Sequence, residues 1–162
     1  MIVSTSAGIR SRLSDPGFTP GVKALPELLG FVAADDEEEA KLATRAILRI
    51  EAQYREKVAT TVVEHARKAK RPARGRLTAL SGRIETPTTT AWLTEALADA
   101  DPKTRRAAAR ALGNVKPTAA ITSALQKAFE GATSDDDRKV LGLALGKAGI
   151  ETGQSGRAGL IA

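Results

Sequence analysis

A short phrase recurs along this chain at a nearly constant interval, and that interval restricts the fold more than any other feature. The phrase is an alanine followed by a larger aliphatic residue, and the alanine advances by 33, 32 and 33 residues from copy to copy. Self-similarity at such a period is typical of stacked helix pairs rather than of one irregular core. The copies are Ala46-Ile47-Leu48, Ala79-Leu80-Ser81, Ala111-Leu112-Gly113 and Ala144-Leu145-Gly146.

The spacing of apolar residues predicts an all-α protein, an α-solenoid of four antiparallel helix pairs in which the second helix of each pair carries the phrase. Asp101 followed by Pro102 is typical of a helix start, because it places a side-chain acceptor at the N-cap and proline at the first helical position. The first helices are expected at 22–34, 57–69, 90–100 and 118–131, and the second helices at 37–53, 72–84, 102–115 and 135–148.

Two glycine-containing segments lack helical periodicity and are expected to flank the solenoid. The sequence therefore predicts three parts: a flexible N-terminal arm at 1–21, a helical-repeat domain at 22–149, and a flexible tail or linker at 150–162.

Composition predicts what the core contains and which sites are excluded. With three Phe, one Trp and one Tyr in 162 residues, the core must consist of Ala, Leu, Val and Ile, which suits a thin stack of two helical layers. The absence of Cys excludes disulfides and thiolate metal sites and favours a cytoplasmic location. No apolar run approaches the roughly 18 residues that a membrane span requires, so no membrane association is expected.

The third pair resembles a HEAT repeat. Residues 97–113 combine an Asp-Pro turn, an arginine shortly afterwards, small residues and Leu-Gly, as in the short HEAT repeats of phycobilisome-lyase-like proteins. Residues 135–146 resemble a weaker copy, with Arg138 matching Arg105. The resemblance implies that second helices line a concave surface and that Arg105 and Arg138 brace the stack by pairing with nearby acids. It also implies binding of proteins, peptides or sometimes nucleic acids, and rarely catalysis.

One position of the second helices is basic in every pair. It precedes the recurring alanine by five residues and projects away from the apolar face. With helices about 8–10 Å apart, these side chains are predicted to form a row on the concave surface that suits successive phosphates or an acidic chain. The row is Lys41, Arg74, Arg106 and Lys139; Arg45 and Arg110 extend it, and Arg71 and Arg76 belong with Arg74 to a dense basic patch.

The sequence leaves two questions about this row open, namely whether it binds anything and which register the second pair has. Lys and Arg are good helix formers, so the basic face is also what an ordinary solvated helix surface would show. In the second pair, Gly75, Arg76 and Arg83 stand where the other pairs have mostly apolar residues, so the register there is either as counted or shifted by one residue.

The sequence supports two hypotheses about function. The first is a non-catalytic scaffold that binds a protein or an acidic partner on the basic face, which the formal net charge of +6 favours. The alternative is a module that binds RNA or DNA backbones, as the N-terminal arm of a nucleic-acid-modifying enzyme. No catalytic, cofactor or metal residues are predicted, because the chain has one His, no Cys and no phosphate-binding glycine loop. Trp92 is expected to pack in the core rather than to stack on a base.

Overall fold

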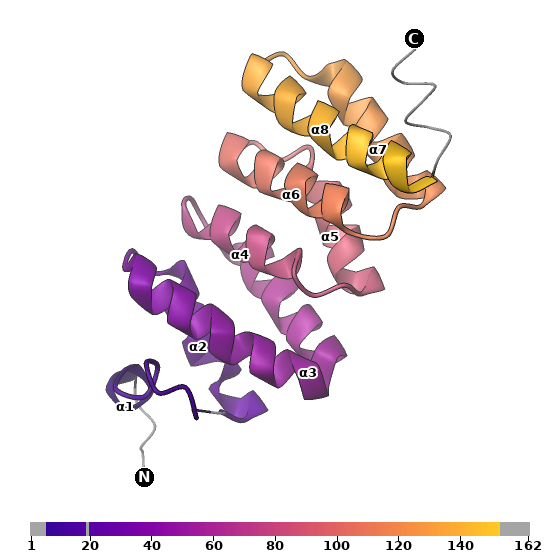
Figure 1. The fold of residues 1–162 in the computed structure, drawn as a ribbon. Coiled ribbons are helices and arrows are strands. Elements are labelled where there is room, and N and C mark those ends of the chain that lie inside the picture. The colour runs from indigo at the N-terminus through magenta and orange to yellow at the C-terminus, as the bar shows by residue number, and fades with distance from the viewer. Residues whose placement is uncertain (1–5, 19, 153–162) are drawn as a thin grey trace.

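The computed structural model describes residues 6–18 and 20–152, and this part of the chain is built from helices without strands (Figure 1). Short loops join the helices, as the predicted helix pairs require. The elements are α1 (Ser6–Arg10), the 3-10 helix η1 (Val22–Ala24), α2 (Leu25–Ala33), α3 (Glu37–Lys68), α4 (Ala73–Ser81), α5 (Pro87–Ala96), α6 (Pro102–Asn114), α7 (Ala119–Gly131) and α8 (Asp135–Thr152).

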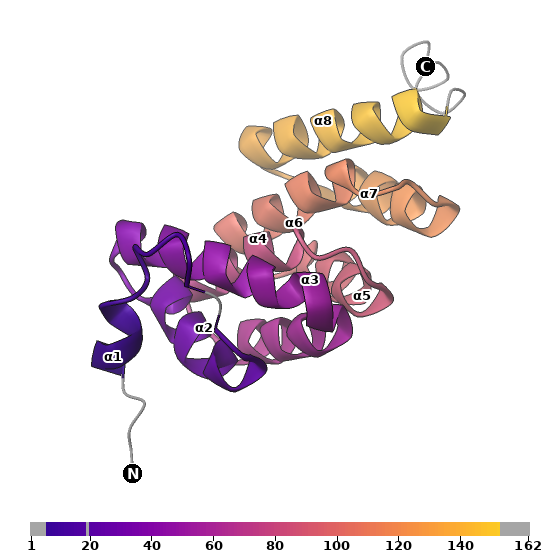
Figure 2. The same cartoon turned by 60° about the horizontal axis from the view of Figure 1, so that its bottom comes forward.

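The helices form two layers, which confirms the predicted α-solenoid. In Figure 1, α4, α6 and α8 follow one another in one layer, with α5 and α7 behind them. The view in Figure 2 separates these layers, and it shows that the first half of α3 continues the layer of α4. The second helices of the pairs therefore lie side by side and present one common face.

Helix α3 differs from the prediction, because it spans two expected helices and the turn between them. It runs from Glu37 to Lys68, and inside it only Tyr54 has non-helical backbone angles, with φ −129° and ψ 50°. The segment contains no glycine or proline that would end a helix. The first and second pairs are therefore joined by a kink rather than by a loop.

Side-chain caps begin several of the helices. The Asp36 carboxylate accepts a hydrogen bond from the Glu39 N–H at 3.0 Å, and Asp101 accepts one from the Lys103 N–H at 3.3 Å. These bonds satisfy amide groups that have no partner within a first helical turn. The caps explain why sequence alone located these starts.

Contacts between glycine and alanine settle the register of the second pair. A Cβ atom on Gly113 would lie 2.9 Å from Cα of Ala144, and a Cβ atom on Gly82 would collide with the side chain of Ala111. The two glycines therefore occupy equivalent positions. Counting back from Gly82, Leu80 corresponds to Ala111, so the register is shifted by one residue from the recurring phrase.

Part of the predicted N-terminal arm is folded against the first pair. Leu13 and Phe18 are buried, and the Phe18 carbonyl accepts a hydrogen bond from Arg49 at 2.7 Å. Arg10 also forms an ion pair with Glu39 at 2.6 Å. Two apolar residues are too few to produce a helical period, so the sequence did not reveal this packing. The remainder of the arm (1–5 and 19) and residues 153–162 of the predicted tail lie outside the described residues.

Candidate functional site

One arginine position of the repeat holds the end of each neighbouring first helix. Arg74 donates to the carbonyls of Ala66 and Arg67 at 3.0 and 2.8 Å. Arg138 makes the equivalent bond to the carbonyl of Ala132, the C-cap of α7, at 3.1 Å. Arg105 donates to the carbonyls of Asp99 and Ala100, in the segment that follows α5, at 2.9 and 3.2 Å. The last carbonyls of a helix lack partners within the helix, and a cation is favourable there.

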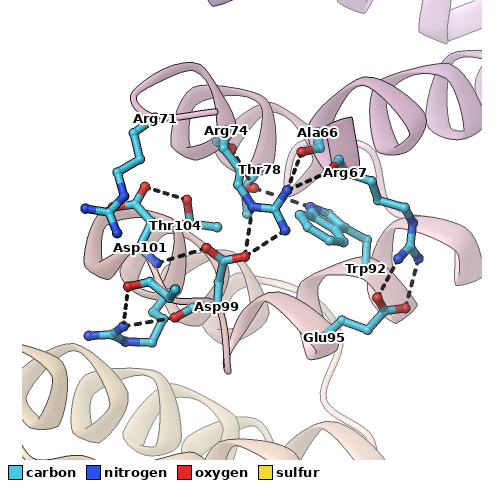
Figure 3. A network of polar contacts seen from close by, with 12 residues as sticks. Ala66, Arg67, Arg71, Arg74, Thr78, Trp92, Glu95, Asp99, Asp101 and Thr104 are labelled. Atoms are coloured by element: carbon cyan, nitrogen blue, oxygen red, sulfur yellow. Dashed lines mark hydrogen bonds and ion pairs between the residues drawn. The ribbon is translucent and has the colours of Figure 1, made fainter. Parts of the chain in front are cut away.

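The same arginines connect successive pairs through aspartates. Arg74 lies 2.7 Å from an Asp99 oxygen, and Arg105 lies 2.9 Å from an Asp137 oxygen. Figure 3 shows the first of these ion pairs, with the Arg74 guanidinium between Asp99 and the end of α3. The bracing role that the HEAT resemblance implied for Arg105 is therefore observed.

The first pair has Ala40 at the arginine position, and a neighbour supplies the missing cation. Arg76 of α4 reaches back to the end of α2, where its guanidinium donates to the carbonyl of Ala33 at 3.3 Å and to that of Ala34. Arg76 is a predicted binding residue, and one nitrogen of its guanidinium group, Nη1, is therefore already used within the fold.

The basic patch at residues 67–76 is partly neutralised by its own surroundings. Arg67 forms a bidentate pair with Glu95, with N–O distances of 2.5 and 2.8 Å. The guanidinium carbons of Arg67 and Arg74 lie 5.1 and 5.0 Å from the centre of the Trp92 ring. Trp92 itself is buried, as predicted, and its indole N–H donates to the Thr78 hydroxyl at 3.3 Å (Figure 3).

The bracing arginines also change the acidity of their partners. Burial alone would raise the pKa of Asp99, but hydrogen bonds from Arg74 and the Asp101 N–H, with nearby positive charge, leave it below the ordinary 3.8. Burial opposes a lower pKa at Asp137 too, and the bonds from Arg105 and Arg106 again bring the net pKa below 3.8. Both aspartates are therefore held as charged partners.

The predicted basic row is interrupted in its middle. Because of the register shift, Arg74 occupies the bracing position, and the buried Gly75 takes the place in the row. The Arg106 side chain is 25 % exposed and lies 3.0 Å from Asp137. The ends of the row, Lys41 and Lys139, are exposed as expected. The projection was wrong at Arg74 because the recurring alanine marked a different register in the second pair.

The other predicted binding residues are spread over the surface. Arg45 and Arg110 are exposed, and their side chains make no hydrogen bond or ion pair with another described residue. Arg71 is 64 % exposed and lies 3.7 Å from an oxygen of the buried Asp101, which is too long for a hydrogen bond.

The structure brings three of the predicted residues together in one groove. The α3–α4 groove has a volume of about 530 Å³ and lies between the first half of α3 and α4. Val32 and Leu80, both buried, contribute its apolar floor. Its lining residues are Val32, Ala40, Lys41, Thr44, Arg45, Arg76, Ala79, Leu80 and Arg83.

Charge within the α3–α4 groove is largely uncompensated. The side chains of Arg45 and Arg83 make no hydrogen bond or ion pair with any described residue, and the Lys41 side chain has only a 3.9 Å contact with the exposed Glu38. Exposed pairs of that kind contribute little. Four cations therefore surround an apolar floor without a buried acid among them.

Sequence reasoning missed Arg83 because it assigned this residue to an apolar position. With the register shifted by one, Arg83 lies one turn after the exposed Ala79 and faces solvent. The sequence signal that could have revealed the shift is the arginine itself, because the other pairs have an apolar residue at the position to which Arg83 was assigned.

A second groove of about 370 Å³ lies near α6, α7 and α8 and has a different charge balance. Arg105 and Arg106 line it, but Asp137 lines it as well and pairs with both. This groove offers no free cation comparable to Arg45. Its location coincides with the brace between α6 and α8.

Neither a metal site nor a membrane-spanning helix is found in the part of the chain that the structure describes. There, no group of three or more His, Cys, Asp or Glu residues is arranged to hold a metal ion. The His65 ring nitrogen Nδ1 lies 2.9 Å from the Thr61 carbonyl of its own helix. Among the described helices, none combines the length and apolar character needed to span a membrane.

Comparison with known proteins agrees with this architecture. A sequence model of HEAT repeats matches residues 59–146, which is more than half of the chain. The chain therefore belongs to the HEAT-repeat family. Neither a curated protein nor a solved structure matches it significantly. HEAT repeats generally mediate protein interactions or act as scaffolds, and the family is typically non-catalytic.

Proposed function

We propose that this protein is a non-catalytic interaction module that binds an acidic segment of a partner protein in the α3–α4 groove. The observation that carries this proposal is the set of cations around the groove, of which Arg45 and Arg83 have no acidic partner among the described residues. A carboxylate from a partner would pair with an arginine in a bidentate arrangement.

The apolar floor narrows the class of partner. Val32, Ala79 and Leu80 would accept one aliphatic side chain between the cations. A groove of about 530 Å³ matches the size of ordinary ligand pockets and holds a few side chains rather than a folded surface. The preferred ligand is therefore a short peptide with an aliphatic residue flanked by Asp or Glu.

The interrupted row favours this ligand over nucleic acid. A nucleic-acid backbone is bound through many phosphate contacts along a continuous positive track. Arg74 and Arg106, which would form the middle of that track, are engaged with Asp99 and Asp137. The uncompensated charge of the α3–α4 groove is local, as a short acidic segment requires.

The test is calorimetric titration of the whole chain with an acidic peptide that has one central leucine, and with single-stranded RNA. Arg45→Glu combined with Arg83→Glu should weaken peptide binding by at least about tenfold, because the cations become repulsive. Lys57→Glu with Lys127→Glu makes the same charge change outside the groove, on exposed residues, and should leave binding unchanged.

Two results would overturn the proposal. One is peptide binding that both double variants weaken equally, which would indicate attraction to net charge alone. The other is tight RNA binding with a steep loss between about 50 and 200 mM salt and no peptide binding, which would support the nucleic-acid hypothesis.

A further inference from the structure

Helix α8 has an outer face that corresponds to the faces of α4 and α6 on which the next pair stacks. The outer face of α8 consists of Arg138, Lys139, Gly142, Leu143 and Gly146. Counting along the repeat, its equivalents in α6 are Arg105, Arg106, Ala109, Arg110 and Gly113.

Glycine at the end of this face receives an alanine from the following pair. A Cβ atom on Gly113 would lie 2.9 and 3.0 Å from Cα and Cβ of Ala144, and Gly82 has the same relation to Ala111. At Gly146 a Cβ atom would meet none of the described residues within 4 Å. The same notch is therefore present on α8, and no described residue fills it.

The arginine of this face receives an aspartate from the following pair. Arg74 pairs with Asp99, and Arg105 pairs with Asp137. Arg138 holds the Ala132 carbonyl as its equivalents hold theirs, but no described acid lies within ion-pair distance of it. The cation is exposed and positioned for a carboxylate.

Leu143 lies between the arginine and the glycine of this face, and its side chain is 65 % exposed. Its equivalents, Ala79 in α4 and Arg110 in α6, are also exposed although a further pair is stacked on each of those helices. The exposure of Leu143 is therefore a property of this position in the repeat, and the arginine and the glycine alone indicate an open interface.

We propose that the outer face of α8 docks a helix pair of the same repeat class from a partner protein. The partner would place an alanine or serine against Gly146 and an aspartate or glutamate against Arg138. These are the groups that α6 receives from α8 itself. This surface is separate from the α3–α4 groove and does not depend on the function proposed for that groove.

The charges and the covered N-terminal end favour such a partner over a second copy of this chain. Head-to-tail stacking would require the first pair, on which Leu13 and Phe18 are packed. In a two-fold contact of antiparallel α8 helices centred on Leu143, Lys139 would oppose Lys147, each four residues from the centre, and these like charges repel.

The experiment titrates the whole chain, by calorimetry, with a synthetic peptide of residues 117–149. This probe contains Ala144, which packs against Gly113 of α6, and Asp137, which pairs with Arg105 of α6. We expect one-to-one binding, weakened at least about tenfold by Gly146→Leu through a clash in the notch. Arg138→Glu should weaken it to a similar degree.

Controls separate docking from misfolding. Gly146 has open space around it, so Gly146→Leu should keep its helical circular dichroism. Lys127→Glu in the protein should leave binding unchanged, and a peptide with Ala144→Leu should not bind.

Four outcomes would overturn the proposal. They are no binding of the probe, binding that Gly146→Leu leaves intact, a dimer in sedimentation experiments that Gly146→Leu abolishes, and binding that appears only after residues 153–162 are deleted. The third would identify a second copy as the occupant, and the fourth would identify the C-terminal segment of the chain itself.

Discussion

Two equivalent glycines of the repeat, Gly113 and Gly146, have different surroundings. Gly113 of α6 faces Ala144 of α8, whereas no described residue lies within 4 Å of a Cβ atom placed on Gly146. The former is needed for close packing of helices, and the latter only weakens the helix that contains it.

Alanine substitutions at these two positions should therefore change stability in opposite directions. Gly113→Ala should lower the free energy of unfolding by about 1–3 kcal/mol, because a backbone atom of Ala144 must move. Gly146→Ala should raise it by up to about 1 kcal/mol through better helix propensity. Urea unfolding followed by circular dichroism measures both. Equal effects would mean that the stack adjusts freely around Gly113.

Individual residue roles were predictable only where the repeat register was right. Arg105 lies in the best-preserved repeat, so resemblance identified it as a brace, although its acid is Asp137. Arg74 has the same role, but the recurring alanine assigned it to the exposed row. The contact of Gly82 with Ala111 decides between the two registers that the sequence leaves open.

At the scale of elements, the pairs are joined by partly buried ion pairs as well as by apolar packing. Asp99 connects the segment between α5 and α6 to α4, and Asp137 connects α8 to α6. Each aspartate has a pKa below 3.8 in the folded protein. Folding is therefore linked to proton binding at these two positions.

Stability should fall with acidification below about pH 4. A carboxyl group with a lowered pKa stabilises the fold above its unfolded pKa of 3.8, and this contribution is lost as the pH falls toward the folded pKa. Asp137→Asn should lower stability at pH 7 and make unfolding less dependent on pH between about 2 and 5. Urea titrations at several pH values measure this. Asp135→Asn is the matched control, since it removes an exposed carboxylate from the same helical turn; an equal change in both variants would contradict the assignment.

Sequence predicted most helices because their ends carry caps, prolines and glycines. It did not predict the continuity of α3, because the apolar pattern weakens around Tyr54 without a residue that breaks helices. It also missed the packing of residues 6–18, since Leu13 and Phe18 are isolated apolar residues. The α3–α4 groove could not be predicted, because it forms where two helices approach each other in space and the sequence pattern describes each helix on its own.

At the scale of the whole molecule, burial is uneven along the stack. Helix α7 buries only Ile121 and Leu125 among its described residues and packs mainly on α8. The kinked α3, by contrast, contacts α2, α4 and α5. A repeat stack of this kind loses structure first where neighbours are fewest.

Hydrogen exchange of backbone amides should therefore be graded. Amides of α7 should exchange at least about tenfold faster than those of α3 between Ala43 and Ile50, because opening α7 exposes fewer buried side chains. Mass spectrometry of the exchanged protein measures the difference at peptide resolution. Uniform protection across α3 and α7 would instead show that the stack opens only as one unit.

The single tryptophan gives the molecule a built-in optical reporter of its middle. Trp92 is buried between Thr78 and the guanidinium groups of Arg67 and Arg74, far along the chain from both ends of the stack. Its fluorescence therefore records the environment of the brace between the second and third pairs, whereas circular dichroism records every helix. Comparing the two signals during unfolding would show, without any label, whether the ends separate from the centre.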